Sequence, residues 1–534
     1  MPTAHSLAPI AFAAVLSALA QQTRDPVTFS GTVMNTATGR PIRNARVTLW
    51  YSPGEFQPVN GGTIQTDAAG AFQFPKLEPG DYRLMVAKNG FTAAEDHPDG
   101  YEISLTASTE KFIAGLTPLS SIRGRITDDA GDAVEGATIV ALQSPIEDGH
   151  RRTQAVQAAI TDDRGEYRIP LLPAGKYWIK ASGNSSRRSY YGANAPPPAG
   201  RETFAPVYFG GSRQMAGAAP VALQPGVETR ADFSVTLEPA HSIHGRIANL
   251  KPHNSADLQL SSGDEDLGLA STTIELATGQ FEIHGVLDGT YRLRAFQRGD
   301  ADQLQAAEQR LVIDGRDVDG IQLTLQPGAS LKGKMRVEGP SDREMADFAI
   351  ILESQDSLLS QSQKRMDRAS SEIKDGAFEI ADVLPGRYWV RLDSEFGMYI
   401  ASARAGNTDL LAAPELVVTA GGSPELEIVQ RADGGGVTGT VAAELARSPE
   451  LVIVLAPESC SRPVEATGME EGNAFSFEGV APGMYRLHAW KASAEVEYGS
   501  PRVACALARS GLPVEVKAGQ ETKVQLQKLS EEPE

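Results

Sequence analysis

One short phrase recurs five times along the chain, and it constrains the fold more than any other feature. Its copies are "FQFPKLEPGDYRLMVA" from Phe72, "YRIPLLPAGKYWIKA" from Tyr167, "FEIHGVLDGTYRLRA" from Phe281, "FEIADVLPGRYWVRL" from Phe378 and "FSFEGVAPGMYRLHA" from Phe475. Repetition of this kind indicates a chain built from similar structural units. The fold of one unit therefore determines the fold class of the whole chain.

The spacing inside the phrase is constant, because an aromatic residue is followed eight positions later by Gly and ten positions later by Tyr. Apolar and polar residues alternate after the Gly, which predicts a half-buried strand, and Pro-Gly pairs predict a tight turn. We expect each Tyr ring to be buried, with its hydroxyl bonded to backbone at the turn. The glycines are Gly80, Gly175, Gly289, Gly386 and Gly483, and the tyrosines are Tyr82, Tyr177, Tyr291, Tyr388 and Tyr485.

Each copy of the phrase lies within a longer unit, and successive tyrosines are 95, 114, 97 and 97 residues apart. A strand such as "FSGTVMN" from Phe29 precedes the phrase, and a strand such as "RADFSVTLEP" from Arg230 follows it. About seven short strands per unit, with turns every 8–12 residues or so, predict an all-β fold of antiparallel β-sandwiches. We predict a tandem array of five such domains, repeats one to five, at residues 27–116, 117–239, 240–328, 329–433 and 434–530.

The net charge and the hydropathy of the chain indicate its partners and its cellular location. The formal net charge of −19 argues against nucleic-acid partners, which need a basic face. Residues 1–20 are predicted to be a signal peptide, because an apolar run ends in an A-x-A site at Ala18-Leu19-Ala20; a buried helix is the alternative. No later segment has the roughly 20 apolar residues that span a bilayer. We expect a secreted, periplasmic or cell-surface protein without a membrane span.

The order "G-x-V", "A-x-V", "T-D-x-x-G-x-F" and "L-x-P-G-x-Y" in repeats one and two resembles the carboxypeptidase regulatory-like domain. Residues 117–239 match this pattern best, and residues 434–530 also carry the phrase closely. The resemblance implies a β-sandwich similar to transthyretin and to starch-binding domains. Such domains accompany zinc carboxypeptidases and also form tandem arrays on exported bacterial proteins. The resemblance is specific for the fold and weak for function, because function depends on sites added to a fold.

The sequence carries none of the common catalytic motifs, so we predict no enzyme and no cofactor. A zinc carboxypeptidase needs His-x-x-Glu, and none of the eight His residues has Glu three positions later. His241 and His244 are expected to be solvated or packed residues on opposite sides of a strand. The chain has no G-x-S-x-G elbow, Walker loop or dinucleotide fingerprint. We therefore predict no catalytic, cofactor-binding or metal-binding residues.

Two further chemistries concern calcium and an internal isopeptide bond. Acidic turns at Asp128, Asp162 and Gly263 have the carboxylates that calcium prefers, although Asp in a tight turn usually bonds its own backbone, and this choice stays open. Adhesin repeats related to the resembled family can form a Lys–Asn isopeptide bond. At the first-strand position after the Gly, only Lys334 has the required amine, and its closing strand "ELEIVQR" has no Asn, so this cross-link is rejected.

Repeat two contains an aromatic insertion, residues 185–213, that the other repeats lack. Exposed rings stack on sugars and Arg donates to hydroxyls or carboxylates, so this segment is the candidate ligand site. The alternative is that the rings cover an open sheet edge. The candidate ligand-binding residues are Arg187, Arg188, Tyr190, Tyr191, Arg201 and Tyr208.

The only two cysteines, Cys460 and Cys505, both lie in repeat five. An oxidising compartment favours a disulfide, but spacing alone cannot show that the two Cα atoms lie close enough. The leading hypothesis for function is a non-enzymatic exported protein that acts as an interaction or spacer module at the cell envelope. The alternative is a carbohydrate-binding module protein. The expected partner is an envelope protein or polysaccharide.

Overall fold

The computed structural model describes residues 26–532 with internal gaps, and each part below is described within that range. The gaps are residues 52–58, 95–96, 148, 184–201, 252–253, 263–264, 267–270, 299–303, 340–348, 355–375, 394–397, 420–423, 443, 446–450, 461–464 and 470–472. The predicted signal peptide lies outside the described residues. The chain divides into two compact units, Met1–Ser120 with Pro225–Val227 and Ser121–Gln224 with Glu228–Glu534.

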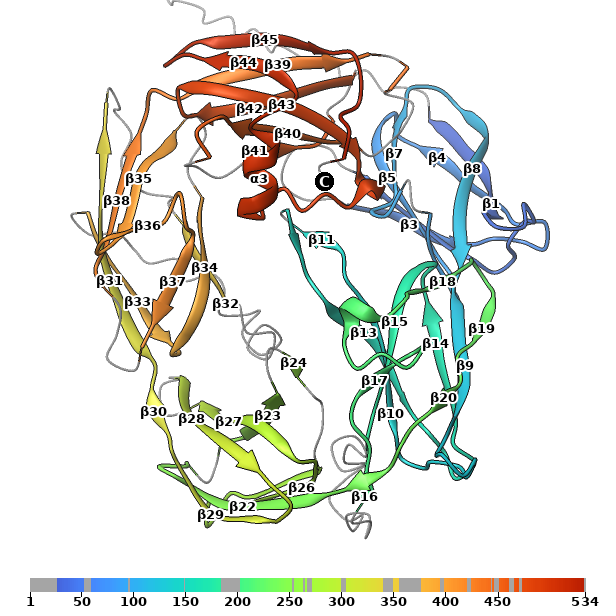
Figure 1. The fold of residues 1–534 in the computed structure, drawn as a ribbon. Helices are drawn as coiled ribbons and strands as arrows, with labels where there is room; N and C mark the ends of the chain where they lie inside the picture. Colours follow the sequence, from blue (N-terminus) through green and yellow to red (C-terminus); the bar gives the residue numbers. More distant parts are fainter. Residues whose placement is uncertain are drawn as a thin grey trace, which may run out of the picture. The chain divides into compact units, whose positions relative to one another are not determined.

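The described chain is nearly all β, and every repeat has two main sheets (Figure 1). Repeat two also has two short strand pairs, β11 (Ile146–Glu147) with β12 (His150–Arg151) and β16 (Glu202–Thr203) with β21 (Glu238–Pro239). In repeat one the first sheet has the order β4 (Ala71–Leu77), β1 (Val27–Asn35), β8 (Thr109–Pro118), β6 (Phe91–Ala93). The second sheet has the order β3 (Val59–Gln65), β2 (Arg46–Tyr51), β5 (Gly80–Ala87), β7 (Tyr101–Leu105). The two strands of the phrase, β4 and β5, therefore belong to different sheets, and the turn between them carries the chain from one sheet to the other.

Repeats two and three have the same arrangement. In repeat two the first sheet has the order β14 (Glu166–Leu172), β9 (Ser120–Thr127), β19 (Glu228–Arg230), and β20 (Phe233–Ser234) also pairs with β9. The second sheet has the order β13 (Gln154–Ile160), β10 (Thr138–Gln143), β15 (Gly175–Ser182), β17 (Val207–Tyr208), and β18 (Val221–Leu223) also pairs with β15. In repeat three the first sheet has the order β25 (Ser271–Glu275), β26 (Gln280–Val286), β22 (His241–Ala248), β29 (Val318–Thr324). The second sheet has the order β24 (Glu265–Asp266), β23 (Ala256–Ser262), β27 (Gly289–Arg298), β28 (Leu304–Ile313), β30 (Gln326–Pro327).

Repeats four and five follow the same plan. In repeat four the sheets are β33 (Ala377–Val383), β31 (Ala329–Glu338), β38 (Leu426–Arg431), β35 (Tyr399–Ala405), β36 (Thr408–Asp409), and β32 (Ala349–Ser354), β34 (Gly386–Asp393), β37 (Glu415–Val418). In repeat five they are β42 (Ala474–Val480), β39 (Gly435–Val441), β45 (Glu521–Leu526), and β41 (Glu465–Thr467), β40 (Leu451–Pro457), β43 (Gly483–Lys491), β44 (Leu512–Val516). Repeat five also has α3 (Pro501–Leu507), the one α-helix in the described part of the chain.

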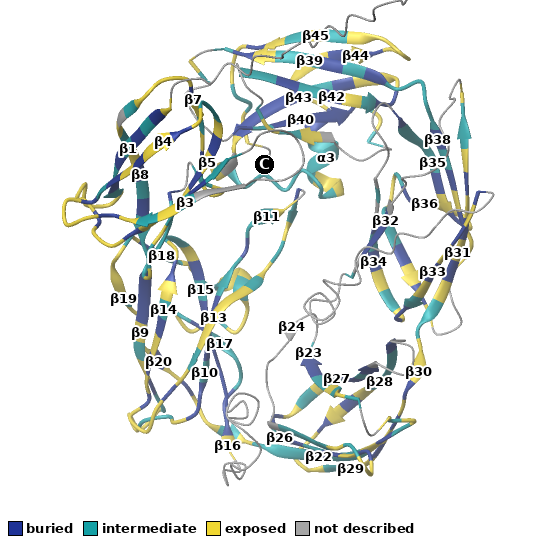
Figure 2. Ribbon diagram, turned by 180° about the vertical axis from the view of Figure 1, so that it is seen from behind, coloured by how far each residue is buried: buried dark blue, intermediate teal, exposed yellow. Residues whose placement is uncertain are grey.

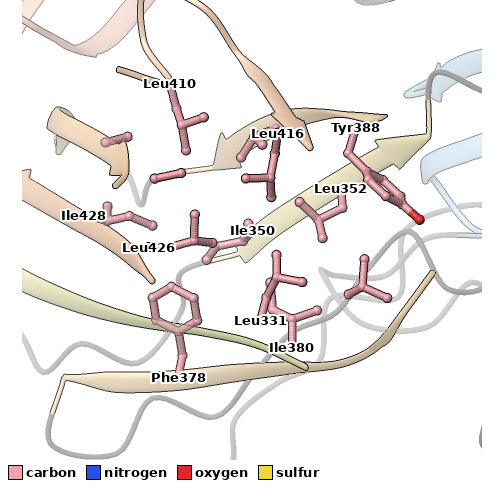
Figure 3. Packing of buried hydrophobic residues seen from close by; sticks show 14 of the residues in the cluster. Leu331, Ile350, Leu352, Phe378, Ile380, Tyr388, Leu410, Leu416, Leu426 and Ile428 are labelled. Atoms are coloured by element: carbon pink, nitrogen blue, oxygen red, sulfur yellow. The ribbon is translucent and has the colours of Figure 1, made fainter. Parts of the chain in front are cut away.

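Each pair of sheets encloses its own cluster of buried apolar side chains. Buried and less buried residues alternate along strands such as β1 and β4, so one face of each sheet points inward (Figure 2). In repeat four, Leu331 and Phe378 of one sheet face Ile350 of the other (Figure 3). Burying one such side chain contributes about 1.5–3 kcal/mol. The prediction of an all-β, sandwich-type fold is confirmed, whereas the division into five domains stays a prediction.

The expectation of purely antiparallel sheets is wrong in one respect. The first strand of each repeat pairs in parallel with the last strand, as β1 does with β8 and β39 with β45. The same holds for β9 with β19 and β20, β22 with β29, and β31 with β38. Alternation within a strand defines which face is buried but carries no information about the direction of its neighbour, so the sequence could not reveal this pairing.

The first strand of each repeat carries a glycine because a ring of the phrase lies against it. A Cβ on any of these glycines would lie no more than 2.8 Å from that ring, closer than the roughly 3.5–4.0 Å at which non-bonded carbons pack. The glycines are Gly31, Gly124, Gly245, Gly333 and Gly439, and the rings are those of Phe72, Tyr167, Phe281, Phe378 and Phe475.

We expect Gly439→Ala to destabilise repeat five by about 2–3 kcal/mol, the usual cost of overpacking a close-packed site. The new methyl group would meet the Phe475 ring and would lie 2.8 Å from the Val524 carbonyl oxygen, so β39 and β45 would have to separate. The measurement is the free energy of unfolding of the full chain, with hydrogen exchange localising the loss to repeat five. Gly468→Ala is the matched control, because a Cβ there would meet nothing within 4 Å. Equal losses in both variants would contradict the steric explanation.

Candidate functional site

The tyrosines of the phrase close the turn that precedes their own strand. Each hydroxyl donates to the carbonyl oxygen four residues earlier, and the five rings are buried. Burial raises the pKa of Tyr177 and Tyr291, so their hydroxyls stay protonated and donate. The bonds are Tyr82–Glu78 at 2.8 Å, Tyr177–Pro173 at 3.0 Å, Tyr291–Leu287 at 2.9 Å, Tyr388–Leu384 at 2.8 Å and Tyr485–Ala481 at 2.6 Å.

The acidic turns bind their own backbone. Asp128 Oδ1 accepts the N–H groups of Ala130 and Asp132, both at 2.9 Å. Asp162 Oδ1 accepts the N–H groups of Arg164 at 3.0 Å and Glu166 at 2.8 Å. These are the local bonds that Asp makes in tight turns. In the described part of the chain no three His, Cys, Asp or Glu side chains are grouped as metal ligands would be, and most of the "GDEDLG" segment lies outside it.

The histidines of β22 take part in polar contacts on repeat three. His244 Nδ1 lies 2.8 Å from Asp319 Oδ1, and its Nε2 lies 2.9 Å from Glu282 Oε1. Burial lowers the pKa of His244, but the hydrogen bonds to these two carboxylates outweigh it and raise the pKa overall. His241 Nε2 lies 3.3 Å from Asp288 Oδ1.

In repeat four, the amine of Lys334 forms an ion pair, with its Nζ 3.0 Å from Glu425 Oε1.

The aromatic insertion contributes to the sandwich of repeat two. Phe204 belongs to the core, and the Phe209 ring packs on Phe233 with centroids 5.8 Å apart. Tyr208 is only 3 % exposed and pairs through β17 with β15. The expectation that Tyr208 faces solvent as a ligand-binding residue is therefore wrong, because β17 extends the sheet instead. Arg187, Arg188, Tyr190, Tyr191 and Arg201 lie outside the described residues, and their ligand role stays a prediction.

The two cysteines meet where α3 covers a sheet of repeat five. Leu507 of α3 packs with Val454, Ala456 and Trp490 in a small cluster next to the main core. Cys505 lies in the same helix, and Cys460 follows β40. Both are free, partly buried thiols in the structure. A hydrogen bond with Cys505 raises the pKa of the Cys460 thiol, so the two sulfur atoms are neighbours.

His488 is a buried neutral residue beneath the same helix. It is 2 % exposed, its Nε2 donates to the Leu507 carbonyl oxygen at 2.9 Å, and its ring stacks on Trp490 with centroids 5.2 Å apart. Nδ1 has no hydrogen-bond partner among the described residues. Burial lowers the pKa of His488.

We expect repeat five to lose stability as the pH falls from about 6.5, the pKa of an unfolded His. The unfolded chain then binds a proton that folded His488 resists, so the contribution of this residue is complete above that pH and is lost toward its lower folded pKa. Each unit of pKa difference corresponds to about 1.4 kcal/mol. Melting temperatures at pH 7.5 and 5.0 should differ less in His488→Gln than in the wild type. An unchanged difference in His488→Gln would refute this role.

A cavity lined by arginines lies over the sheet of repeat three that contains β27 and β28. Its volume is about 850 Å³, and four arginines and one glutamate line it. Arg292 and Arg294 come from β27, Arg310 comes from β28, and Arg387 comes from β34 of repeat four. Arg294 is 5 % exposed, and its Nε lies 2.6 Å from Glu308 Oε2. The sequence did not single out these arginines, because they stand at ordinary polar positions of alternating strands.

Solved structures similar to this chain include bacterial pilins. The shaft pilin SpaA of Lactobacillus rhamnosus GG is 11 % identical, with 40 % of this chain and 98 % of that chain covered and a TM-score of 0.23. The minor pilin GBS52 of Streptococcus agalactiae is 12 % identical, with 40 % and 97 % covered and a TM-score of 0.23. The major pilin subunit BcpA of Bacillus cereus is 12 % identical, with 56 % and 99 % covered and a TM-score of 0.17.

A search of curated proteins found no match. None of the helices in the described part of the chain has the length and apolar character of a membrane span. The model of the carboxypeptidase regulatory-like domain matches residues 28–108 and 121–236, which are parts of repeats one and two. The resemblance drawn from the motifs is thereby confirmed. The chain thus carries two regions in tandem that match the carboxypeptidase regulatory-like domain.

Proposed function

We propose that the chain is an exported, non-enzymatic protein whose tandem β-sandwiches act as an interaction or spacer module at the cell envelope. The main support is that the residues of the repeated motif serve the fold. Tyr hydroxyls bind backbone carbonyls, the first-strand glycines make room for rings, and Asp128 and Asp162 bind turn N–H groups. Each further copy of the motif therefore adds another folded domain and not another active site.

The test of this function combines export with binding. The full chain, expressed in its native host, should lose residues 1–20 and fractionate with the envelope or the medium. The purified mature chain should be retained by envelope proteins or by envelope polysaccharide, on separate columns, and should not hydrolyse peptide or glycoside substrates. Retention in the cytoplasm, or turnover of either substrate, would contradict the proposal.

We also propose that the array comprises five separately folded domains. Five separate clusters of buried side chains, one in each repeat, support this division. Limited proteolysis should give stable fragments of roughly 10 kDa, with cuts in exposed junctions. The expected cut sites are near Thr117, Ala240, Ala329 and Gly434. A resistant body that spans residues 121–534 would show instead that the second compact unit is the folding unit.

A second candidate function is carbohydrate binding, and the arginine-lined cavity of repeat three favours it. Concave sites with a few fixed polar groups are the usual binding sites for small ligands, and this cavity falls within the size range of such sites, about 300–1,000 Å³. Retention of the mature chain on purified polysaccharides, with bare resin as the control, tests this function as a whole. Absence of retention on every glycan tested would exclude it.

A further inference from the structure

We propose that the cavity over β27 and β28 binds an anionic polysaccharide through the carboxylate or phosphate groups of the polymer. This inference rests on the second proposed function, carbohydrate binding, and names its site and its ligand class. It depends mainly on Arg292, Arg294 and Arg310, all of which lie in repeat three.

The strand register places two like charges side by side. Arg292 of β27 pairs directly with Arg310 of β28, so the two side chains project from the same face of the sheet. Two guanidinium groups that project from one face can donate charge-assisted hydrogen bonds to the same anion. The register therefore favours the binding of an anion between these two residues.

The neighbouring arginine is held in a fixed position. Arg294 lies two residues after Arg292 on the same face of β27, and Glu308 on β28 is its direct partner. Their ion pair, 2.6 Å long, anchors a guanidinium group that is almost fully buried at the cavity wall. Arg guanidinium groups match carboxylate and phosphate oxygens in geometry. Positive charge thus predominates at this site, in a chain whose net charge is −19.

The rest of the lining favours a sugar polymer over an acidic peptide. Gln309, Gln322 and Thr324 supply amide and hydroxyl groups, which match the hydroxyl groups of sugars. A peptide strand added to a sheet edge needs pockets for its alternate side chains. The apolar lining here consists mostly of small or cyclic residues, such as Ala306, Ala307 and Pro385, which offer little depth for such side chains.

The experiment compares the mature full chain with the double variant Arg292→Gln/Arg310→Gln. The probes are polygalacturonic acid for carboxylates, poly(glycerol phosphate) for phosphates, uncharged dextran and poly-glutamate. The wild type should bind one of the two anionic glycans more tightly than dextran or poly-glutamate, and less tightly at high salt. The double variant should bind that glycan about a hundredfold more weakly, since it loses the charge-assisted hydrogen bonds of both guanidinium groups.

The control variant is Arg230→Gln/Arg336→Gln, which removes two exposed strand arginines outside the cavity. It loses the same charge and should bind as the wild type does. The double variant should melt at the same temperature as the control variant, so that its weaker binding does not reflect a loss of folding. Equal weakening in both variants would show general charge attraction and overturn the site. Tighter binding of poly-glutamate than of either glycan would overturn the ligand class.

Two outcomes separate this inference from the function on which it rests. If the chain binds a glycan and the Arg292→Gln/Arg310→Gln variant binds it equally well, the site is wrong while carbohydrate binding stands. If no glycan of any charge is retained, carbohydrate binding fails and the site fails with it.

Discussion

Tyr177→Ala should lower the stability of repeat two by about 3–5 kcal/mol, as truncation of a large buried aromatic side chain does. The Tyr177 side chain is fully buried in the core that both sheets enclose, so the substitution removes packing and leaves a cavity. Tyr177→Phe keeps the ring and loses only the 3.0 Å hydrogen bond to the Pro173 carbonyl, so it should cost about 1 kcal/mol.

Denaturant unfolding of the full chain measures both variants, and hydrogen exchange should place the loss in repeat two. Trp178, next to the substituted residue, provides a fluorescence signal from the same strand. If the two substitutions cost the same, the hydroxyl bond rather than the buried ring holds the turn, and the assigned role of the ring is wrong.

Oxidation should join Cys460 to Cys505 and should stabilise repeat five by about 4 kcal/mol in the chain-entropy model for a loop of this length. The two residues are 45 positions apart, and Cys505 is the main cause of the raised pKa of the Cys460 thiol. A small disulfide such as oxidised glutathione would accept the two electrons: both cysteine thiols lose their protons, one S–S bond forms, and two glutathione thiols are released. The bond would fix α3 to the end of β40.

Titration of free thiols in unreduced, denatured protein decides whether the bond forms. Protein purified from the oxidising compartment should show none, and reduction should release two. The stability gain should disappear on reduction and should be absent in Cys505→Ser, whose stability should not respond to reductant. Two reactive thiols in protein isolated without reductant would refute the disulfide.

Much of the fold could be read from the sequence because it depends on local pattern. Alternation around Gly175 and Tyr177 predicts two strands and a turn, and the structure has β14 and β15 there. The parallel pairing of first and last strands could not be read, since it joins residues about 100 positions apart, such as Ser121 and Glu228. The sequence shows that Gly439 and Phe475 both belong to recurring motifs. It does not show that the Phe475 ring packs against Gly439, because that contact depends on the fold.

The candidate site was harder to predict for the same reason. Composition drew attention to the aromatic insertion, yet Tyr208 is buried because β17 pairs with β15. Arg292 and Arg310 are 18 residues apart in the sequence, and only the register of β27 and β28 places them opposite each other. A cluster of like charges produced by strand pairing leaves no linear motif.

The parallel pairing of first and last strands also determines how a repeat would bear mechanical load. In repeat five the chain enters at the start of β39 and leaves at the end of β45, and these two points lie at opposite ends of the paired strands. Tension between them pulls the two strands past each other, so all the hydrogen bonds of the pair resist at once. In an antiparallel pair the entry and exit points would share one end, and the bonds would open one after another. The parallel pairing of first and last strands should therefore make each repeat resist stretching along the chain.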